Sequence, residues 1–165
     1  MRWKICTFEQ LTQIELYQLL KLRVDIFVVE QNAPYSDLDG KDCAEGVMHV
    51  LGFDGDEVVA YSRLLPQGMG YPEEVKPYLG ENKSDTAIGR VVVHSAYRGR
   101  GLGDELLRVS IAAMQRHEFS APVFISAQSY LVPYYQKQGF EVFTPAYMED
   151  GCDMRGMRSN VFHTP

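Results

Sequence analysis

The segment from residue 87 to residue 103, AIGRVVVHSAYRGRGLG, constrains the fold more than any other part of the chain. It begins with an apolar, β-branched run that predicts a buried strand, and a helical pattern follows it to about residue 118. Two arginines and three glycines lie between them. Free N–H groups at a helix N-terminus attract phosphate, and glycines let the backbone approach it closely. The segment therefore predicts a strand–loop–helix unit that binds a phosphorylated ligand.

Two well-known phosphate-binding loops do not fit this segment. A Walker P-loop requires Lys followed by Ser or Thr after its last glycine, whereas two acidic residues follow Gly103. In the Rossmann fingerprint G-x-G-x-x-G, the third glycine would stand where this chain has Asp104. The pattern that remains is R-x-x-G-x-G, which begins at Arg98. Arg98 and Arg100 add charge-assisted donors, which favour a ligand with more than one phosphate.

The other elements indicate an α/β fold of the α+β type, with a mixed sheet in a single domain over residues 1–165. A chain of 165 residues with 45% hydrophobic composition can bury one sizeable core. The strands are expected at residues 3–8, 47–53, 58–65, 87–94, 122–128, 140–144 and 153–158. The helices are expected at residues 12–25, from the glycine segment to about 118, and at 131–138.

Composition argues against several classes of protein. A formal net charge of −6 disfavours a general nucleic-acid binder, which needs surplus Lys and Arg. The longest aliphatic clusters are far too short to cross a bilayer. The three cysteines and four histidines lack the spacings typical of metal sites or disulfide frameworks. We therefore expect a cytoplasmic protein that binds no metal, nucleic acid or membrane.

Two long polar loops, residues 30–46 and 66–85, are candidates for shaping a binding site. The first loop carries Asp37, Asp39 and Asp42 in a spacing that is superficially similar to a calcium loop. However, its glycine stands at the fourth position rather than the sixth, which excludes an EF-hand. These aspartates are expected either to stabilise the loop or to give an acceptor pocket negative charge.

Two motifs together resemble the GNAT N-acetyltransferase superfamily. The first is R-x-x-G-x-G after a strand, and the second is YYQKQGF at residues 134–140, which is similar to the superfamily's FYxKxGF segment. The ElaA-like branch is matched further by LYQLLKLRVDIFVVEQ, YSDLDGKD, YSRLLP and IGRVVV. The resemblance covers roughly residues 10–158. It implies a GNAT-type acyl-CoA N-acyltransferase fold with acetyl-CoA as co-substrate.

The resemblance also implies which residues bind the cofactor. The pyrophosphate would be bound by Arg98, Gly99, Arg100, Gly101, Leu102 and Gly103. Backbone groups of Val91, Val92 and Val93 would bind pantetheine where this strand parts from the strand at residues 122–128, since unpaired backbone groups need partners. Gln128, at the end of that second strand, would touch the cofactor or cap the local structure.

The resemblance assigns the catalytic roles less completely, because it leaves the general base open. Tyr135 matches the superfamily tyrosine that protonates the coenzyme A thiolate. Some members place a glutamate on the strand before the pyrophosphate loop, but Ala87 stands near that position here. The substitutes as general base are Glu30, His49 or a water held by them, and an amine that is already neutral would need little help. Glu30 could instead cap or pair with Arg23 or Arg63, and His49 could be a structural histidine.

The resulting expectation is an N-acetyltransferase that moves an acetyl group to a primary amine by direct transfer in a ternary complex. The acceptor, a small molecule or a peptide amine, would be chosen by the two long loops. A non-catalytic acyl-CoA-binding or sensor domain is the main alternative, and a different acyl group is a further one. The oligomeric state stays open, with a homodimer through terminal strands as one option.

Overall fold

The computed structural model describes residues 1–119 and 122–159 of the chain. The chain divides into two compact units, which we describe separately. The first unit comprises Met1–Leu64 with Arg90–Ala113, and the second comprises Leu65–Gly89 with Met114–Pro165. Strand β4 and helix α2 contribute residues to both units.

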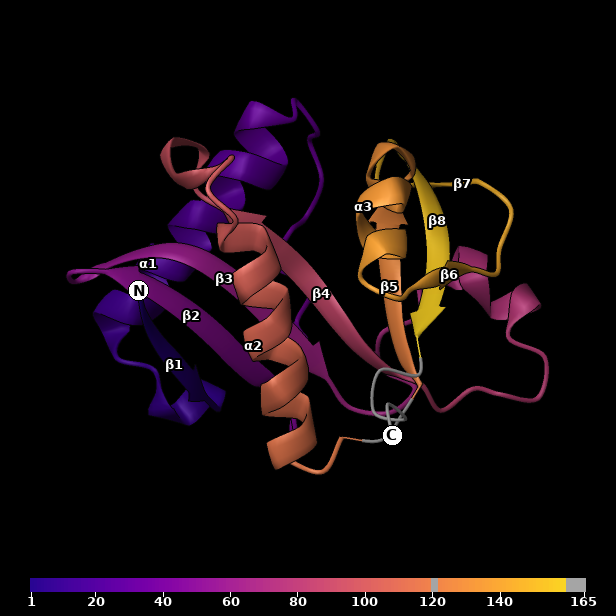
Figure 1. Ribbon diagram of the computed structural model, residues 1–165, viewed down its shortest axis with the longest axis horizontal. Coiled ribbons are helices and arrows are strands. Elements are labelled where there is room, and N and C mark those ends of the chain that lie inside the picture. Colours follow the sequence, from indigo (N-terminus) through magenta and orange to yellow (C-terminus); the bar gives the residue numbers. More distant parts are fainter. Residues whose placement is uncertain (120–121, 160–165) are drawn as a thin grey trace. The chain divides into compact units, whose positions relative to one another are not determined.

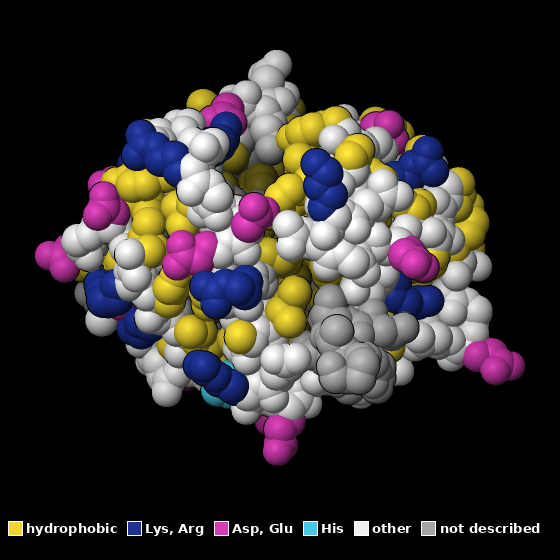
Figure 2. Space-filling model, in the orientation of Figure 1, with side chains coloured by type: hydrophobic (Ala, Val, Ile, Leu, Met, Phe, Trp, Pro, Cys, Tyr) yellow, Lys and Arg dark blue, Asp and Glu magenta, His cyan; other side chains and the backbone are white. Residues whose placement is uncertain are grey.

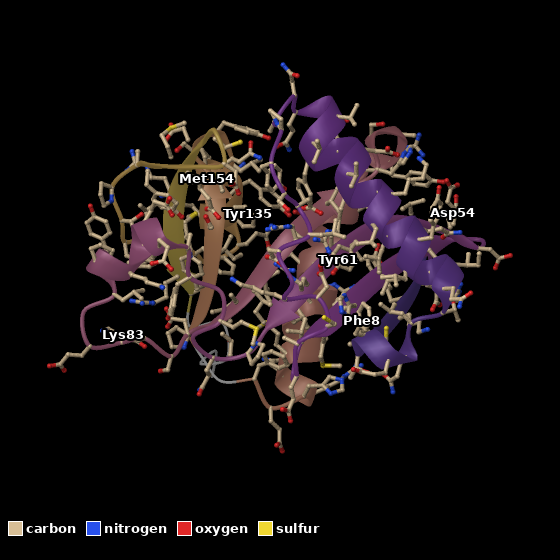
Figure 3. The ribbon with its side chains drawn as sticks, turned by 180° about the vertical axis from the view of Figure 1, so that it is seen from behind. Phe8, Asp54, Tyr61, Lys83, Tyr135 and Met154 are labelled. Carbon is tan, nitrogen blue, oxygen red and sulfur yellow. The ribbon has the colours of Figure 1, made fainter. Side chains whose placement is uncertain are left out.

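The first unit is built on a β-sheet with a helix on each face. Its neighbouring strands are, in order, β1 (Arg2–Cys6), β2 (Met48–Asp54), β3 (Glu57–Leu65) and the end of β4 (Thr86–Val93). The pairs β1–β2 and β2–β3 are antiparallel. Figure 1 shows α2 (Leu102–Arg116) in front of β3, and the reverse view in Figure 3 shows α1 (Gln13–Arg23) on the other face.

Helix α1 begins at the capping box predicted from the sequence. Glu15 N–H donates to Thr12 Oγ1 at 3.2 Å, and Thr12 N–H donates to Glu15 Oε2 at 2.8 Å. Lys4 on β1 donates to the same Glu15 oxygen at 2.7 Å, which ties the helix start to the sheet. The helix continues beyond its predicted end as a π-helix, η2 (Val24–Glu30), and this continuation carries Glu30.

A hydrophobic core fills the space between α1, η2 and the sheet. Its buried residues are Cys6, Leu19, Leu22, Ile26, Leu51, Phe53, Val58, Tyr61 and Val92. Full burial of a Val, Leu, Ile or Phe side chain contributes roughly 1.5–3 kcal/mol. Because Val92 belongs to this core, the end of β4 is held in place by packing as well as by the sheet.

The hairpin predicted from the Asp-Gly pair is present. Asp54 pairs with Glu57, and the intervening turn places Gly55 at a φ of 58°. A left-handed φ of this kind is favourable for glycine and costly for most other residues. The turn residues therefore set the register next to the turn, up to a register shift between Gly52 and Phe53.

The second unit contains the start of β4 and the C-terminal strands. Its further elements are η3 (Glu73–Tyr78), β5 (Val123–Gln128), α3 (Val132–Lys137), β6 (Glu141–Val142), β7 (Tyr147–Glu149) and β8 (Cys152–Ser159). The start of β4 pairs in parallel with β5 at Thr86 with Val123 and at Ala87 with Phe124. Strand β8 is antiparallel to β5, β6 and β7, and α3 lies in front of β5 in Figure 1.

The last part of the chain differs from its sequence prediction. The strand expected at residues 140–144 is reduced to Glu141–Val142, and β7 was not predicted. Thr144 Oγ1 accepts a hydrogen bond from Gly156 N at 2.8 Å, so a side chain replaces the strand ladder there. A Cβ on Gly156 would lie 2.7 Å from Thr144 Cγ2, so this contact requires glycine. Pro145 follows and cannot donate a ladder hydrogen bond.

On the face in Figure 2, acidic and basic side chains are interspersed with hydrophobic ones, so the charge on this face is mixed. Within residues 1–119 and 122–159, no helix has both the length and the apolar character that crossing a membrane requires.

Candidate functional site

The glycine segment forms the strand–loop–helix unit expected from the sequence. His94 Nδ1 accepts from Ala96 N at 3.2 Å and caps the short helix Ser95–Tyr97, which fits its expected role in local structure. Gly99 and Gly101 follow with φ of 72° and 77°, and α2 begins at Leu102. A Cβ at either glycine would meet no atom within 4 Å. Backbone conformation, rather than space, is therefore what favours glycine here.

The two arginines of this segment have exposed side chains. Arg98 Nε donates to the carbonyl of Val93 at 3.1 Å, and Arg98 Nη1 donates to Glu30 Oε1 at 2.7 Å. The Arg98–Glu30 pair is solvent-exposed, with 44% and 40% of the side-chain surfaces accessible. Exposed ion pairs contribute little stability, so a more highly charged anion can take the place of Glu30. Arg100 is exposed on the same loop.

Glu30 therefore has a partner that the sequence did not suggest. The expected alternatives were Arg23 or Arg63, and both of these arginines bind aspartates instead. The π-helical end of η2 extends the helix by more than a turn beyond its predicted end at residue 25, and this carries Glu30 to the glycine segment. Sequence periodicity does not reveal such a continuation.

The valines of β4 lie on two faces of the strand. Val92 is buried in the core under α1, whereas Val91 and Val93 are half-buried on the opposite face. Arg90 precedes them with a φ of 52°, which is uncommon for a residue with a side chain. Its guanidinium donates from Nε to Asp37 Oδ1 at 2.7 Å and from Nη2 to the Asp37 carbonyl at 3.0 Å.

Arg90 belongs to a network of three arginines and three aspartates in the first unit. Fully buried Arg23 donates from Nε to Asp37 Oδ2 at 2.8 Å and from Nη1 to Asp42 Oδ1 at 2.7 Å. Arg63, from β3, also binds Asp42. Opposite charges in contact are the usual way in which a protein tolerates buried ions.

The third aspartate of the network, Asp39, binds Arg63 at 2.6 Å. Burial raises the pKa of Asp39, but the Arg63 guanidinium outweighs it and holds the pKa well below its usual range. The same balance between burial and Arg23 lowers the pKa of Asp42. These aspartates thus stay ionised, and their ion pairs hold the loop at residues 30–46 in place. This agrees with the expectation that the aspartates stabilise the loop.

His49 lies fully buried on β2 with both ring nitrogens engaged. Its Nε2 is 2.9 Å from the Asp42 carbonyl, and its Nδ1 is 2.8 Å from Tyr61 Oη. Because a carbonyl can only accept, Nε2 must carry the proton, and Nδ1 then accepts from Tyr61. Burial lowers the pKa of His49, so the neutral ring is favoured. This geometry fits the structural alternative for His49.

Tyr135 and Gln128 lie in the second unit. Tyr135 is buried on α3, edge-to-face with Tyr134 and Phe140, and Figure 3 labels it. Burial raises the pKa of Tyr135 to about 12, so its phenol remains protonated at neutral pH. Gln128 ends β5 opposite Met154 of β8 and stands before the short helix Ser129–Leu131.

A comparison with known proteins decides the family. The profile of the "Acetyltransferase (GNAT) domain" matches residues 74–161. The protein ElaA of Escherichia coli K12 is 37% identical over 159 residues, which cover 96% of each chain. The chain belongs to the GNAT acetyltransferase family.

Solved structures of other GNAT proteins agree with this assignment. An acyl-CoA N-acyltransferase from Pseudomonas aeruginosa superimposes with a TM-score of 0.82 at 36% identity, covering 96% of this chain and 99% of that one. Escherichia coli ElaA gives a TM-score of 0.80 at 37% identity, covering 96% and 98%. The ElaA-like resemblance and the mixed-sheet GNAT fold expected from the sequence are thus confirmed, and the fold implies an acyl-CoA co-substrate.

One cluster of hydrogen-bonded side chains in this GNAT chain was not predicted from the sequence. Ser126 Oγ on β5 is 2.6 Å from Tyr147 Oη and 2.7 Å from Glu149 Oε2, both on β7. The only signal in the sequence is a polar–apolar–polar triplet, Tyr-Met-Glu, which is too short to predict a strand.

In the part of the chain that the structure describes, no group of three or more His, Cys, Asp or Glu could hold a metal ion.

Proposed function

We propose that this chain transfers an acetyl group from acetyl-CoA to a primary amine by direct transfer in a ternary complex. The observation that carries the proposal is the N-terminus of α2, which follows two left-handed glycines and two exposed guanidinium groups. Free N–H groups, the helix dipole and arginine donors together favour a diphosphate. Family membership and the Pseudomonas acyl-CoA N-acyltransferase support the same cofactor class.

The proposed cofactor contacts begin at the segment from Arg98 to Gly103. Its backbone N–H groups and the Arg98 and Arg100 side chains bind the diphosphate, which replaces Glu30 as the partner of Arg98. The backbone of Val91–Val93 binds the pantetheine amides and donates to the thioester oxygen as negative charge develops there. Gln128 makes a further polar contact with the cofactor.

The proposed chemistry requires a neutral amine and a proton for the leaving group. The amine nitrogen attacks the thioester carbonyl, the C–S bond breaks, and the thiolate takes a proton from Tyr135. A thiol has a pKa of about 8.5, so a phenol with a raised pKa gives up its proton only when held in direct contact with the thiolate. In this scheme His49 is not a base, and its ring binds the Asp42 carbonyl in the loop at residues 30–46. Glu30 is the partner of Arg98 until the diphosphate binds.

A thiol-release assay with acetyl-CoA and a panel of primary amines tests the proposal. We expect release of coenzyme A with at least one amine, and acetyl-CoA to be used faster than longer acyl-CoA esters. Ala87 stands near the position at which the resemblance places a strand glutamate in some superfamily members, and this missing carboxylate favours the alternative of a non-catalytic acyl-CoA-binding or sensor domain. Calorimetric binding of coenzyme A without thiol release from any amine would support that alternative.

Three further expectations belong to this proposal. The two units act as one catalytic domain over residues 1–165. The enzyme works in the cytoplasm, a reducing compartment in which Cys6, Cys43 and Cys152 would remain thiols. A homodimer is tested by light scattering at several protein concentrations.

A further inference from the structure

A tyrosine next to the glycine segment connects that segment to the sheet of the first unit. Tyr97 is the last residue of the short helix η4 (Ser95–Tyr97) and directly precedes Arg98. Its hydroxyl donates to Asp54 Oδ2 at 2.7 Å, since a carboxylate can only accept. Asp54 ends β2 at the turn of the β2–β3 hairpin, where Figure 3 labels it. The hydrogen bond therefore joins the hairpin to the start of the segment that precedes α2.

Other contacts of η4 fix the direction in which the tyrosine points. The rings of His94 and Tyr97 pack edge-to-face, with centroids 5.9 Å apart. His94 N–H donates to the carbonyl of Val59 on β3 at 2.8 Å, and Tyr97 N–H donates to the carbonyl of His94 at 2.9 Å. The start of η4 is thus attached to β3 through the backbone, and its end is attached to β2 through the phenol.

The phenol keeps its proton at neutral pH. The hydrogen bond to Asp54 raises the pKa of Tyr97, and the negative charges of Asp54 and Glu57 raise it further, although the Arg100 guanidinium opposes this. An unperturbed phenol already has a pKa of about 10. Tyr97 therefore remains a hydrogen-bond donor under the conditions in which the cofactor would bind.

The glycine segment has few other means of holding its conformation. Gly99 and Gly101 have left-handed φ angles, and a Cβ on either would meet no atom within 4 Å. Ordering a glycine costs more backbone entropy than ordering any other residue. The hydrogen bond from Arg98 to Glu30 also holds the segment, but the diphosphate replaces Glu30 in the proposed function. The hydrogen bond from Tyr97 to Asp54 does not have to break for the diphosphate to bind.

We infer that Tyr97 and Asp54 are positioning residues that hold the segment from Arg98 to Gly103 in the conformation that binds the diphosphate. The inference rests on the proposed function and adds two residues outside the R-x-x-G-x-G motif. A loop that is already ordered loses less entropy on binding, so the hydrogen bond strengthens cofactor binding without touching the cofactor. Because Asp54 is exposed, the same hydrogen bond contributes little to the stability of the fold.

Calorimetric titration of coenzyme A into wild type and three single variants tests the inference. Tyr97→Phe removes the hydroxyl and keeps the ring that packs on His94. We expect Tyr97→Phe and Asp54→Ala each to weaken binding roughly three- to tenfold. Asp54→Asn should bind nearly as tightly as wild type, because its amide oxygen still accepts from the phenol. The double variant Tyr97→Phe with Asp54→Ala should lose no more than either single variant, since both remove the same hydrogen bond.

A second carboxylate in the same turn controls for charge. Asp56 is exposed between β2 and β3, and Asp56→Ala removes one negative charge from the hairpin, as Asp54→Ala does. Loss of a nearby negative charge favours an anionic ligand, so Asp56→Ala should leave coenzyme A binding unchanged or slightly tighter. The inference predicts the opposite direction for Asp54→Ala. Thermal denaturation should show little difference between the single variants and wild type.

The other outcomes identify which proposal fails. Wild-type affinity in Tyr97→Phe, or equal losses in Asp54→Asn and Asp54→Ala, would overturn the inference and leave the proposed function standing. Absence of coenzyme A binding by the wild-type protein would overturn the proposed function, and the inference with it. If Asp54→Ala does not fold by circular dichroism, Tyr97→Phe decides alone: weaker binding supports the inference, and wild-type binding rejects it.

Discussion

The two units of this GNAT chain use carboxylates in different ways. In the first unit, Asp37, Asp39 and Asp42 contact three guanidinium groups, and the charges neutralise one another inside the protein. In the second unit, the Glu149 carboxylate accepts from a serine that accepts in turn from a tyrosine. Ion pairs between fixed partners hold a loop in place, whereas a chain of hydroxyl groups can relay a proton. The comparison separates carboxylates that are neutralised by ion pairs from one that accepts a hydrogen bond from a hydroxyl group.

The largest expected effect comes from breaking the ion network. Asp37 accepts from Arg23 and Arg90, so Asp37→Ala removes one of the two carboxylates that neutralise the buried Arg23 and the closer of the two that bind Arg90. We expect the free energy of unfolding, measured by urea denaturation, to fall by about 3–5 kcal/mol. Asp25→Ala, which removes the exposed ion pair with Lys21, is the control and should change little. Equal stability of the two variants would contradict the structural role of the network.

A smaller effect, on rate rather than on stability, is expected for Tyr135→Phe in the second unit. The change removes the proposed proton donor and keeps the ring that packs on Phe140. We expect kcat to fall roughly 10–100-fold with unchanged coenzyme A binding. Tyr134→Phe removes the hydroxyl group of the neighbouring tyrosine and is the matched control. It should keep kcat within about twofold. Full turnover by Tyr135→Phe would remove Tyr135 from the mechanism.

The smallest effect is expected at Glu30. This carboxylate is exposed and shares Arg98 with the proposed diphosphate. Because the ligand must displace it, Glu30→Gln should tighten coenzyme A binding by about two- to fivefold at low salt, and less at high salt. Calorimetry at two ionic strengths measures this. Weaker binding in the variant would show that Glu30 supports the cofactor rather than competing with it.

Local patterns in the sequence were sufficient to predict much of the fold. The capping box at Thr12, the Asp-Gly hairpin and the strand–glycine–helix segment each depend on residues close together in the chain, and each is present in the structure. The short strand β7 and the π-helix η2 were missed. A three-residue strand has almost no periodicity, and a π-helix begins with the same pattern as an α-helix.

The partners of charged residues were harder to predict. Arg23 binds Asp37 across 14 positions of the sequence, and Arg90 binds the same aspartate across 53. Ion pairs between residues so far apart in the sequence depend on how strands and loops pack. Local sequence patterns do not predict this packing. For the same reason, Ser126 and Glu149, which are 23 positions apart, showed no joint signal. The family motif predicted a cofactor-binding segment, but it did not predict which carboxylate could act as base.

Calorimetric titration of coenzyme A tests the central claim most directly. The double variant Arg98→Ala with Arg100→Ala is compared with wild type and with Arg116→Ala, an exposed arginine at the other end of α2. If the segment before α2 binds the diphosphate, the double variant should lose roughly 2–4 kcal/mol of binding free energy, and Arg116→Ala should lose almost none. Unchanged affinity in the double variant would contradict the account.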